Sequence, residues 1–142
     1  MRQCRIHQVL ASYTTAATAG DLLVVVCSSG GAGTFSITQA GFTAAKNESS
    51  TASQAMFYKI AAGGETTITC NTTGSTMPMS VQVFEYSGIE NTNLVDAVNT
   101  TTSTGTGTAL SSGSLSSLNS NDLLFAAVTT TNTSSAVSFT PQ

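Results

Sequence analysis

The sequence is poor in charged side chains and in several residue types on which protein chemistry often depends. Its 142 residues include four Lys or Arg, seven Asp or Glu, one His, two Pro, three Cys and no Trp. Charged residues make up 8% of the chain, against roughly 25% in typical soluble domains. Four scattered cations and a net charge of −3 exclude the basic stripe that nucleic-acid binding requires, so we expect no nucleic-acid partner.

Long hydrophobic runs are missing as well. The longest apolar runs span residues 22–27 and 123–128, about a third of the length of a bilayer-spanning helix. We therefore expect no membrane partner. Arg2 and Arg5 near the start are not followed by the roughly 7 to 15 apolar residues of a secretory signal. This predicts either a protein that works without Sec export or a mature or cut form.

The three cysteines, Cys4, Cys27 and Cys70, lie at spacings that match no zinc or haem pattern. Cys27 ends an apolar run and Cys70 ends a run of Thr and Ile, so both are predicted to be small buried strand residues. We expect unpaired thiols in the core. A Cys27–Cys70 disulfide and an intermolecular use of Cys4 are the alternatives.

Catalytic and ligand-binding motifs are equally scarce. His7 is the only histidine and has no Cys or carboxylate at a useful spacing, so a Ser-His-Asp arrangement is not supported. The glycine-rich residues 30–33 precede no helix and are predicted to form a turn rather than a phosphate loop. Residues 90–96, rich in Asn, Asp and Glu, are predicted to form a turn, with a calcium site as the alternative. We predict no catalytic, metal or cofactor-binding residue.

Hydroxylated residues take the place of the charged ones. Ser and Thr number 20 and 25, together 45 of the 142 residues. Their side chains lose little rotamer entropy on packing, which suits a close-packed assembly or an extracellular surface. Sequons at Asn47, Asn71, Asn99 and Asn132 are close to the number expected by chance in such a sequence and are weak evidence for glycosylation.

Short apolar runs separated by Gly, Ser, Thr and Asn clusters predict an all-β chain with no substantial helix. Their regular spacing is typical of a single antiparallel β-sandwich of about 8–10 strands. The predicted strands span residues 6–10, 22–27, 34–38, 54–62, 66–70, 79–86, 107–110, 123–129 and 136–140. Because Gly63-Gly64 separates two of them, residues 54–70 are predicted to form a hairpin. Residues 79–86 carry apolar side chains at both odd and even positions, so the sequence leaves open whether both faces of this strand are buried.

The length predicts one domain over residues 1–142. Residues 1–19 are expected to form an N-terminal arm or edge strand. Residues 99–120, rich in Ser, Thr and Gly, are expected to form a long loop and an edge strand, with a linker between two domains as the alternative.

One phrase occurs twice in the sequence. Asp21-Leu22-Leu23 opens an apolar run that leads through small residues into residues 35–38, and Asp122-Leu123-Leu124 opens a similar run that leads into residues 137–140. Both copies predict strand, turn, strand. We interpret them as strands of one sandwich rather than as two small domains.

Several motifs occur in a fixed order: Gly20-Asp21-Leu22-Leu23, Gly41-Phe42-Thr43, Met56-Phe57-Tyr58-Lys59, Val83-Phe84-Glu85-Tyr86 and Asn121-Asp122-Leu123-Leu124. From about residue 20 to residue 140 this series resembles the jelly-roll-like β-sandwich modules of tailed-phage virion proteins and bacterial extracellular proteins. Such modules commonly have Trp where Phe42 stands and continue with further strands after the second phrase. The resemblance therefore implies either a fragment or a missing strand supplied by a neighbouring chain.

Together these observations and the resemblance predict a non-enzymatic structural protein of a virus particle, such as a capsid decoration, head-fibre or tail-associated protein. Its expected partners are other copies of itself and neighbouring virion proteins, met through exposed strand edges. The alternative is a glycan-binding or adhesive module of a secreted bacterial protein, extracellular or at the cell surface, with Tyr13, Tyr58 or Tyr86 lining a sugar site. A surface-filament subunit completed by strand exchange is a further alternative.

Overall fold

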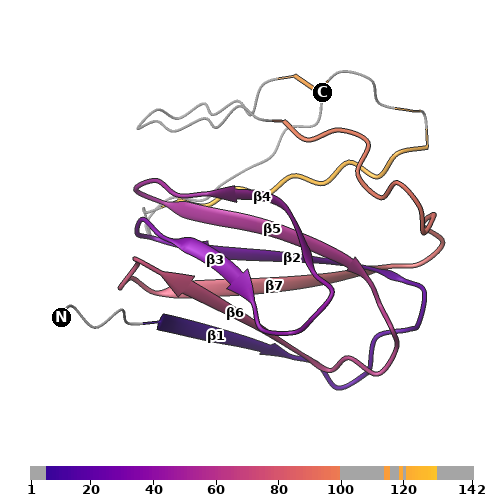
Figure 1. Cartoon of the computed structure of the whole chain (residues 1–142), viewed down its shortest axis with the longest axis horizontal. Coiled ribbons are helices and arrows are strands. Elements are labelled where there is room, and N and C mark those ends of the chain that lie inside the picture. The colour runs from indigo at the N-terminus through magenta and orange to yellow at the C-terminus, as the bar shows by residue number, and fades with distance from the viewer. Residues whose placement is uncertain (1–5, 100–113, 116–118, 120, 131–142) are drawn as a thin grey trace.

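The fold is a β-sandwich in a computed structural model that describes residues 6–99, 114–115, 119 and 121–130. Over these residues it contains seven strands and no helix, arranged in two antiparallel sheets that pack against each other (Figure 1). The strands are β1 (Ile6–Ser12), β2 (Leu22–Ser29), β3 (Thr34–Ile37), β4 (Thr43–Glu48), β5 (Ser53–Ile60), β6 (Thr67–Thr73) and β7 (Met79–Tyr86). The all-β sandwich predicted from the sequence is confirmed.

The strand order is β1-β6-β3 in one sheet and β4-β5-β2-β7 in the other. Strands β4 and β5, β3 and β6, and β2 and β7 form nested antiparallel pairs, as in a long hairpin folded over on itself. This nesting is jelly-roll-like. Strand β1 lies at the margin of the nest and is an edge strand of its sheet over the described residues.

Strand β2 forms the centre of the core because β5 and β7 flank it on both sides. Alternate residues such as Val25 and Cys27 point between the sheets, where they meet Ile68 and Cys70 of β6. All four side chains are fully buried. The apolar run of the first phrase therefore forms a strand that is buried on both faces. This explains why its sequence does not alternate between apolar and polar residues.

The outward face of the four-stranded sheet is covered by residues that follow β7. Phe125 packs edge-on against Phe84 and Tyr86 of β7, with ring centroids 5.1 and 6.4 Å apart. Lys46 of β4 donates a hydrogen bond to the carbonyl oxygen of Asn99 at 2.7 Å. Figure 1 shows this stretch in orange and yellow beside the sheet. Both faces of β7 are therefore partly buried, the possibility that its sequence left open.

The second copy of the repeated phrase is not a strand. Residues 121–130 have no strand partner in the described part of the chain, so the predicted strand over residues 123–129 and the interpretation of both copies as strands of one sandwich are wrong. The first copy enters the gap between β5 and β7, where backbone partners are present on both sides. The second copy meets the face of that sheet, where only side chains are left to contact.

Two further predictions need correction. Strands β5 and β6 lie in different sheets, so residues 61–66 connect the layers and the predicted hairpin is wrong. The sequence pattern also does not predict β4. A register shift between Ala44 and Lys46 interrupts its alternation with a bulge, and its Ala and charged residues give no apolar periodicity. The predicted strands at residues 107–110 and 136–140 lie outside the described residues.

Candidate functional site

A disulfide joins the two sheets through the centre of the core. Cys27 of β2 and Cys70 of β6 form it, with their Cα atoms 6.2 Å apart and a separation of 43 positions in sequence. Both residues are fully buried, as predicted, but the expectation of unpaired thiols is wrong. The two cysteines face each other only because their strands pack in opposite layers, which spacing in the sequence does not show. Cys4 lies outside the described residues.

Four polar side chains lie close together at one end of the sandwich, and we call them the end cluster. They are Tyr13, Lys59, Glu65 and Glu85. Lys59 and Glu85 flank Leu23 in the register of the four-stranded sheet, so both start from its inner face. The Lys59 Nζ lies 2.7 Å from Glu65 Oε1, and each side chain is only 12% exposed. The same ammonium lies 5.3 Å from the centroid of the Phe42 ring. The ion pair is therefore sheltered between the sheets rather than exposed on the surface.

The end cluster keeps Glu65 ionised. A hydrogen bond from Lys59, helped by the backbone N–H of Ala62 at 2.9 Å, lowers the pKa of Glu65 to about 2 even though burial opposes the shift. Burial raises the pKa of Tyr13, and the nearby carboxylates of Glu65 and Glu85 raise it further. Tyr13 is consequently a neutral hydrogen-bond donor beside two anions at neutral pH.

A cavity of about 290 Å³ opens beside the end cluster. Its lining residues are Tyr13, Thr14, Thr15, Leu23, Val83 and Glu85. Glu85 Oε1 accepts a hydrogen bond from the Thr18 N–H at 2.7 Å, and the Tyr13 hydroxyl is buried with no hydrogen-bond partner in the described structure. The cavity is at the lower limit of the sizes usual for small-molecule sites, and four of its six lining residues are polar. It could hold a small hydroxylated group between Tyr13 and Glu85.

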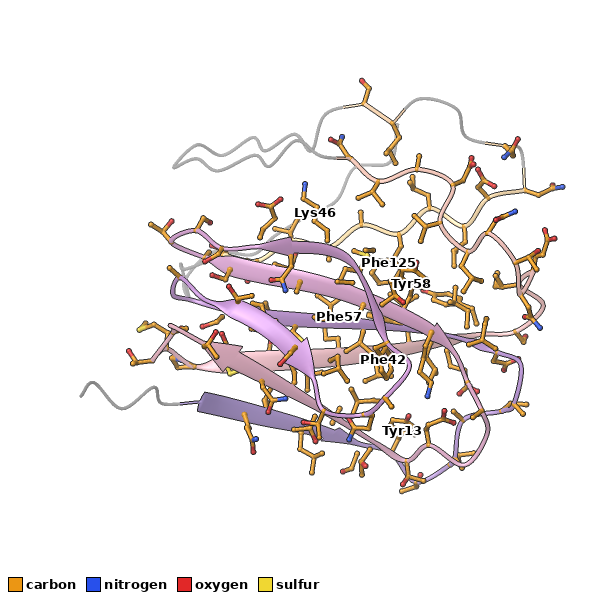
Figure 2. The ribbon with its side chains drawn as sticks, in the orientation of Figure 1. Tyr13, Phe42, Lys46, Phe57, Tyr58 and Phe125 are labelled. Atoms are coloured by element: carbon orange, nitrogen blue, oxygen red, sulfur yellow. A yellow bond between two sulfur atoms is a disulfide. The ribbon has the colours of Figure 1, made fainter. Side chains whose placement is uncertain are left out.

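The three tyrosines considered for a sugar site do not come together. Tyr58 and Tyr86 both start from the outward face of the four-stranded sheet, in register with Val24 and Leu22, whereas Tyr13 lies at the end cluster. Figure 2 shows Tyr13 well apart from Tyr58 and Phe125. Because Phe125 contacts the Tyr86 ring, that ring is not free for stacking on a sugar. A cavity adjoins Tyr13.

The outward side of the three-stranded sheet carries uncharged, mainly hydroxylated side chains, and we call it the hydroxyl face. Its residues are Gln8, Leu10 and Ser12 of β1, Thr67, Thr69, Asn71 and Thr73 of β6, and Thr34 and Ser36 of β3, continued by Thr38. Most of these side chains are exposed, and Leu10 is 58% exposed. The face arises because Thr and Ser occupy alternate positions of strands whose other positions are buried. It thus presents hydroxyl donors and acceptors without any charge.

Residues 90–96 form bends, and their carboxylates accept hydrogen bonds from uncharged side chains. Glu90 Oε1 accepts a hydrogen bond from the Thr92 hydroxyl at 2.8 Å, and Asp96 Oδ2 accepts one from Asn119 Nδ2 at 3.2 Å. Asn93 has a positive φ of 52°, which suits an Asn in a turn. No group of three or more His, Cys, Asp or Glu in the described ranges could hold a metal ion.

Three of the four sequon asparagines form side-chain hydrogen bonds in the described part of the chain. Asn47 bonds the backbone of Phe35, and Asn71 Nδ2 donates to the Thr38 hydroxyl at 2.9 Å. Asn99 Nδ2 donates to the Ser114 carbonyl at 3.4 Å. Asn132 lies outside the described residues. In the register of β1, His7 lies opposite Thr72 of β6.

Comparisons with protein-family models, with curated proteins and with solved structures found no match. The described residues include no helix long and apolar enough to cross a bilayer. The fold and the features above are therefore the basis for a functional proposal.

Proposed function

We propose that this chain is a non-enzymatic structural protein of a virus particle, a capsid decoration, head-fibre or tail-associated protein that assembles in many copies. The observation that supports this proposal is the hydroxyl face. It extends over all three strands of one sheet and carries no charged side chain. Two like copies can approach such a surface without electrostatic repulsion, and Ser and Thr lose little side-chain entropy when they are ordered in a contact.

Hydroxyl groups also suit contacts between identical surfaces. Each Ser or Thr hydroxyl both donates and accepts a hydrogen bond, so a face rich in them can match a second copy of itself or the backbone of a neighbouring protein. Charged side chains, by contrast, need opposite partners in defined positions. A repeated particle component needs many such neutral contacts.

Self-association of the purified full chain tests the structural role. We expect native mass spectrometry over a wide concentration range to show oligomers, and electron microscopy to show ordered assemblies or binding to virus particles of the same genome. Capsid, portal or tail genes beside the coding gene would support the virion assignment. A chain that stays monomeric at every concentration contradicts the proposal.

A second candidate, an extracellular glycan-binding or adhesive module, is favoured by the disulfide. A Cys27–Cys70 bond buried between the sheets is typical of proteins in oxidising compartments. In this role Tyr13 and Glu85 would hold a sugar hydroxyl in their cavity. Glycan-array binding that is lost with Tyr13→Phe, and retained with Tyr58→Phe as the matched control, would support this candidate over the structural one.

A further inference from the structure

We propose that two copies of this chain associate through the free edge of β1, which pairs with the β1 of the second copy about a two-fold axis at Leu10. The inference rests on the proposed function, because it names the surface through which copies meet. Strand β1 pairs with β6 along one side and has no strand on its other side in the described part of the chain. We call residues 8–12 on that open side the β1 edge.

The register identifies which backbone groups of the β1 edge are available. Tyr13 N–H donates to the Thr66 carbonyl at 3.0 Å, so Tyr13 belongs to the residues that bond to β6. In an antiparallel ladder these residues alternate with residues whose N–H and C=O groups point the other way. The backbone groups of Gln8, Leu10 and Ser12 therefore point away from β6, into the open side of the sheet.

The other three sheet edges carry features that oppose the addition of a strand. Strand β3 has only four residues, and β4 contains a bulge and the ion pair between Lys46 and Glu48. Strand β7 carries Glu85, which binds the Thr18 N–H beside the edge. Short length, bulges and charges are the usual protections of edge strands. The β1 edge has none of them: its register is regular and its residues include no charge and no Pro.

A groove next to the β1 edge adds apolar surface to the free backbone groups. It has a volume of about 360 Å³. Its lining residues are Gln8, Val9, Thr76, Met77, Pro78 and Met79. Met77 is 48% exposed, and on the opposite side of the sheet Leu10 is 58% exposed. Methionine side chains adapt to irregular partners, so the groove can take side chains that a second strand brings to it.

An antiparallel pair of β1 strands centred on Leu10 gives the free backbone groups of Gln8, Leu10 and Ser12 hydrogen-bond partners. Leu10 then lies opposite Leu10 of the second copy, and Gln8 lies opposite its Ser12. The free backbone N–H groups of each copy therefore face free backbone C=O groups of the other. The two exposed leucines cover each other on the hydroxyl face. Because the axis is perpendicular to the sheet, the inner faces stay on the same side, and each methionine groove lies beside Ala11 and Ser12 of the second copy. The two-fold rotation thus covers both Leu10 side chains and places a strand of the second copy beside each groove.

A second copy fits this edge better than a charged partner does. Between Gln8 and Ser12 the edge has no charge, so two like copies do not repel each other and a charged segment finds no complement. An antiparallel strand pair is also self-complementary, as a two-fold interface requires, and two-fold dimers are the commonest closed assemblies.

Native mass spectrometry of the full chain and of matched variants tests the interface. We expect the wild type to form a species of twice its 14.4 kDa mass, and Leu10→Lys to raise the dimer dissociation constant by at least about tenfold, because a lysine on the edge opposes strand addition. Leu124→Lys is the control, because Leu124 is 63% exposed but lies away from β1. Circular dichroism of each variant establishes that the sandwich is folded.

Cross-linking tests the register. In a Cys4→Ser background, Leu10→Cys is expected to form a covalent dimer on mild oxidation, whereas Ser36→Cys, two strands further from the axis, is not. If the chain forms an oligomer that Leu10→Lys does not weaken and that does not cross-link at residue 10, this interface is wrong. The proposed structural role is not contradicted by that result. A monomer at every concentration overturns both. A monomer in which the Leu10 amide is protected from hydrogen exchange shows that the chain covers its own edge, for example with residues 136–140, and also overturns the interface.

Discussion

The side-chain amide of Asn47 pairs with the backbone of Phe35 as a neighbouring strand would. Asn47 Nδ2 donates to the Phe35 carbonyl at 2.8 Å, and Asn47 Oδ1 accepts from the Phe35 N–H at 3.3 Å. Asn47 lies on β4 and Phe35 on β3, so the pair connects the two sheets at one side of the sandwich. Phe35 itself is a core residue, 3% exposed. One side chain therefore connects β3 and β4 at a side of the sandwich where, among the described residues, no strand pairing joins the two sheets.

Replacing Asn47 tests this connection. We expect Asn47→Ala to lower the free energy of unfolding by about 1–3 kcal/mol, because both backbone groups of Phe35 lose their side-chain partner. Urea unfolding followed by circular dichroism measures the change. Asn91→Ala, at an exposed position of the bend after β7, is the control and should change stability by less than about 0.5 kcal/mol. Equal effects of the two substitutions would contradict the role assigned to Asn47.

The disulfide should contribute a large share of the stability. Because it closes a loop of 43 residues across the core, replacing both Cys27 and Cys70 with Ala is expected to cost about 2–4 kcal/mol. Urea midpoints measured with and without reductant give the test. The wild type should lose stability in reductant, whereas the double variant should not respond to it. An unchanged wild-type midpoint after verified reduction of the bond would show that packing alone holds the sheets together.

The ion pair of the end cluster should make stability depend on acid. Glu65 has a folded pKa of about 2, below the usual value of 4.5 for a glutamate, so the folded state favours the carboxylate. Its contribution is fully present above about pH 5 and is lost as the pH falls toward 2. It amounts to at most about 3 kcal/mol. Glu65→Gln should flatten the stability profile between pH 5 and pH 2 relative to wild type. A variant that keeps the wild-type slope would assign the acid sensitivity to other carboxyl groups.

A glycine near the end of the β2–β3 connection has no room for a side chain. A Cβ on Gly33 would lie 2.5 Å from the Thr72 hydroxyl oxygen and 3.0 Å from the Thr73 carbonyl. Gly33→Ala is therefore expected to destabilise the fold by about 1–3 kcal/mol through overpacking against β6. At Gly30 the nearest atom is 3.9 Å away, so Gly30→Ala is the matched control in thermal unfolding. A Gly33→Ala protein as stable as this control would show that β6 yields at this point.

Phe125 should control how well the four-stranded sheet is covered. Phe125→Ala removes the ring contacts with Phe84 and Tyr86 and is expected to cost about 1–3 kcal/mol. The exposed sheet face should also bind more of a hydrophobic fluorescent dye, and residues after β7 should be cleaved faster in limited proteolysis. Leu124→Ala, whose side chain is 63% exposed, serves as the control. Dye binding and cleavage that match this control would show that Phe125 does not hold the segment in place.

Local pattern was sufficient for six of the seven strands, because alternation and apolar runs are properties of neighbouring residues. It did not reveal β4, whose bulge breaks the alternation, or the place of residues 123–129, whose apolar run is the same whether it enters a sheet or covers one. The end cluster was also not visible, since Tyr13, Lys59 and Glu65 come from three separate segments. A charged residue at an inward-facing position, such as Lys59, was the one signal that could have indicated it.

By itself the sequence determined the class of the fold, the position of most strands and a surface rich in hydroxyls and poor in charge. These follow from composition and short-range periodicity, which every conformation of the chain shares. Only the tertiary structure decided the partners: which strands share a sheet, that Cys27 meets Cys70, and that one edge of β1 has no strand beside it in the described part of the chain. Such pairings join residues tens of positions apart, and their energy depends on packing between layers, which no local pattern records.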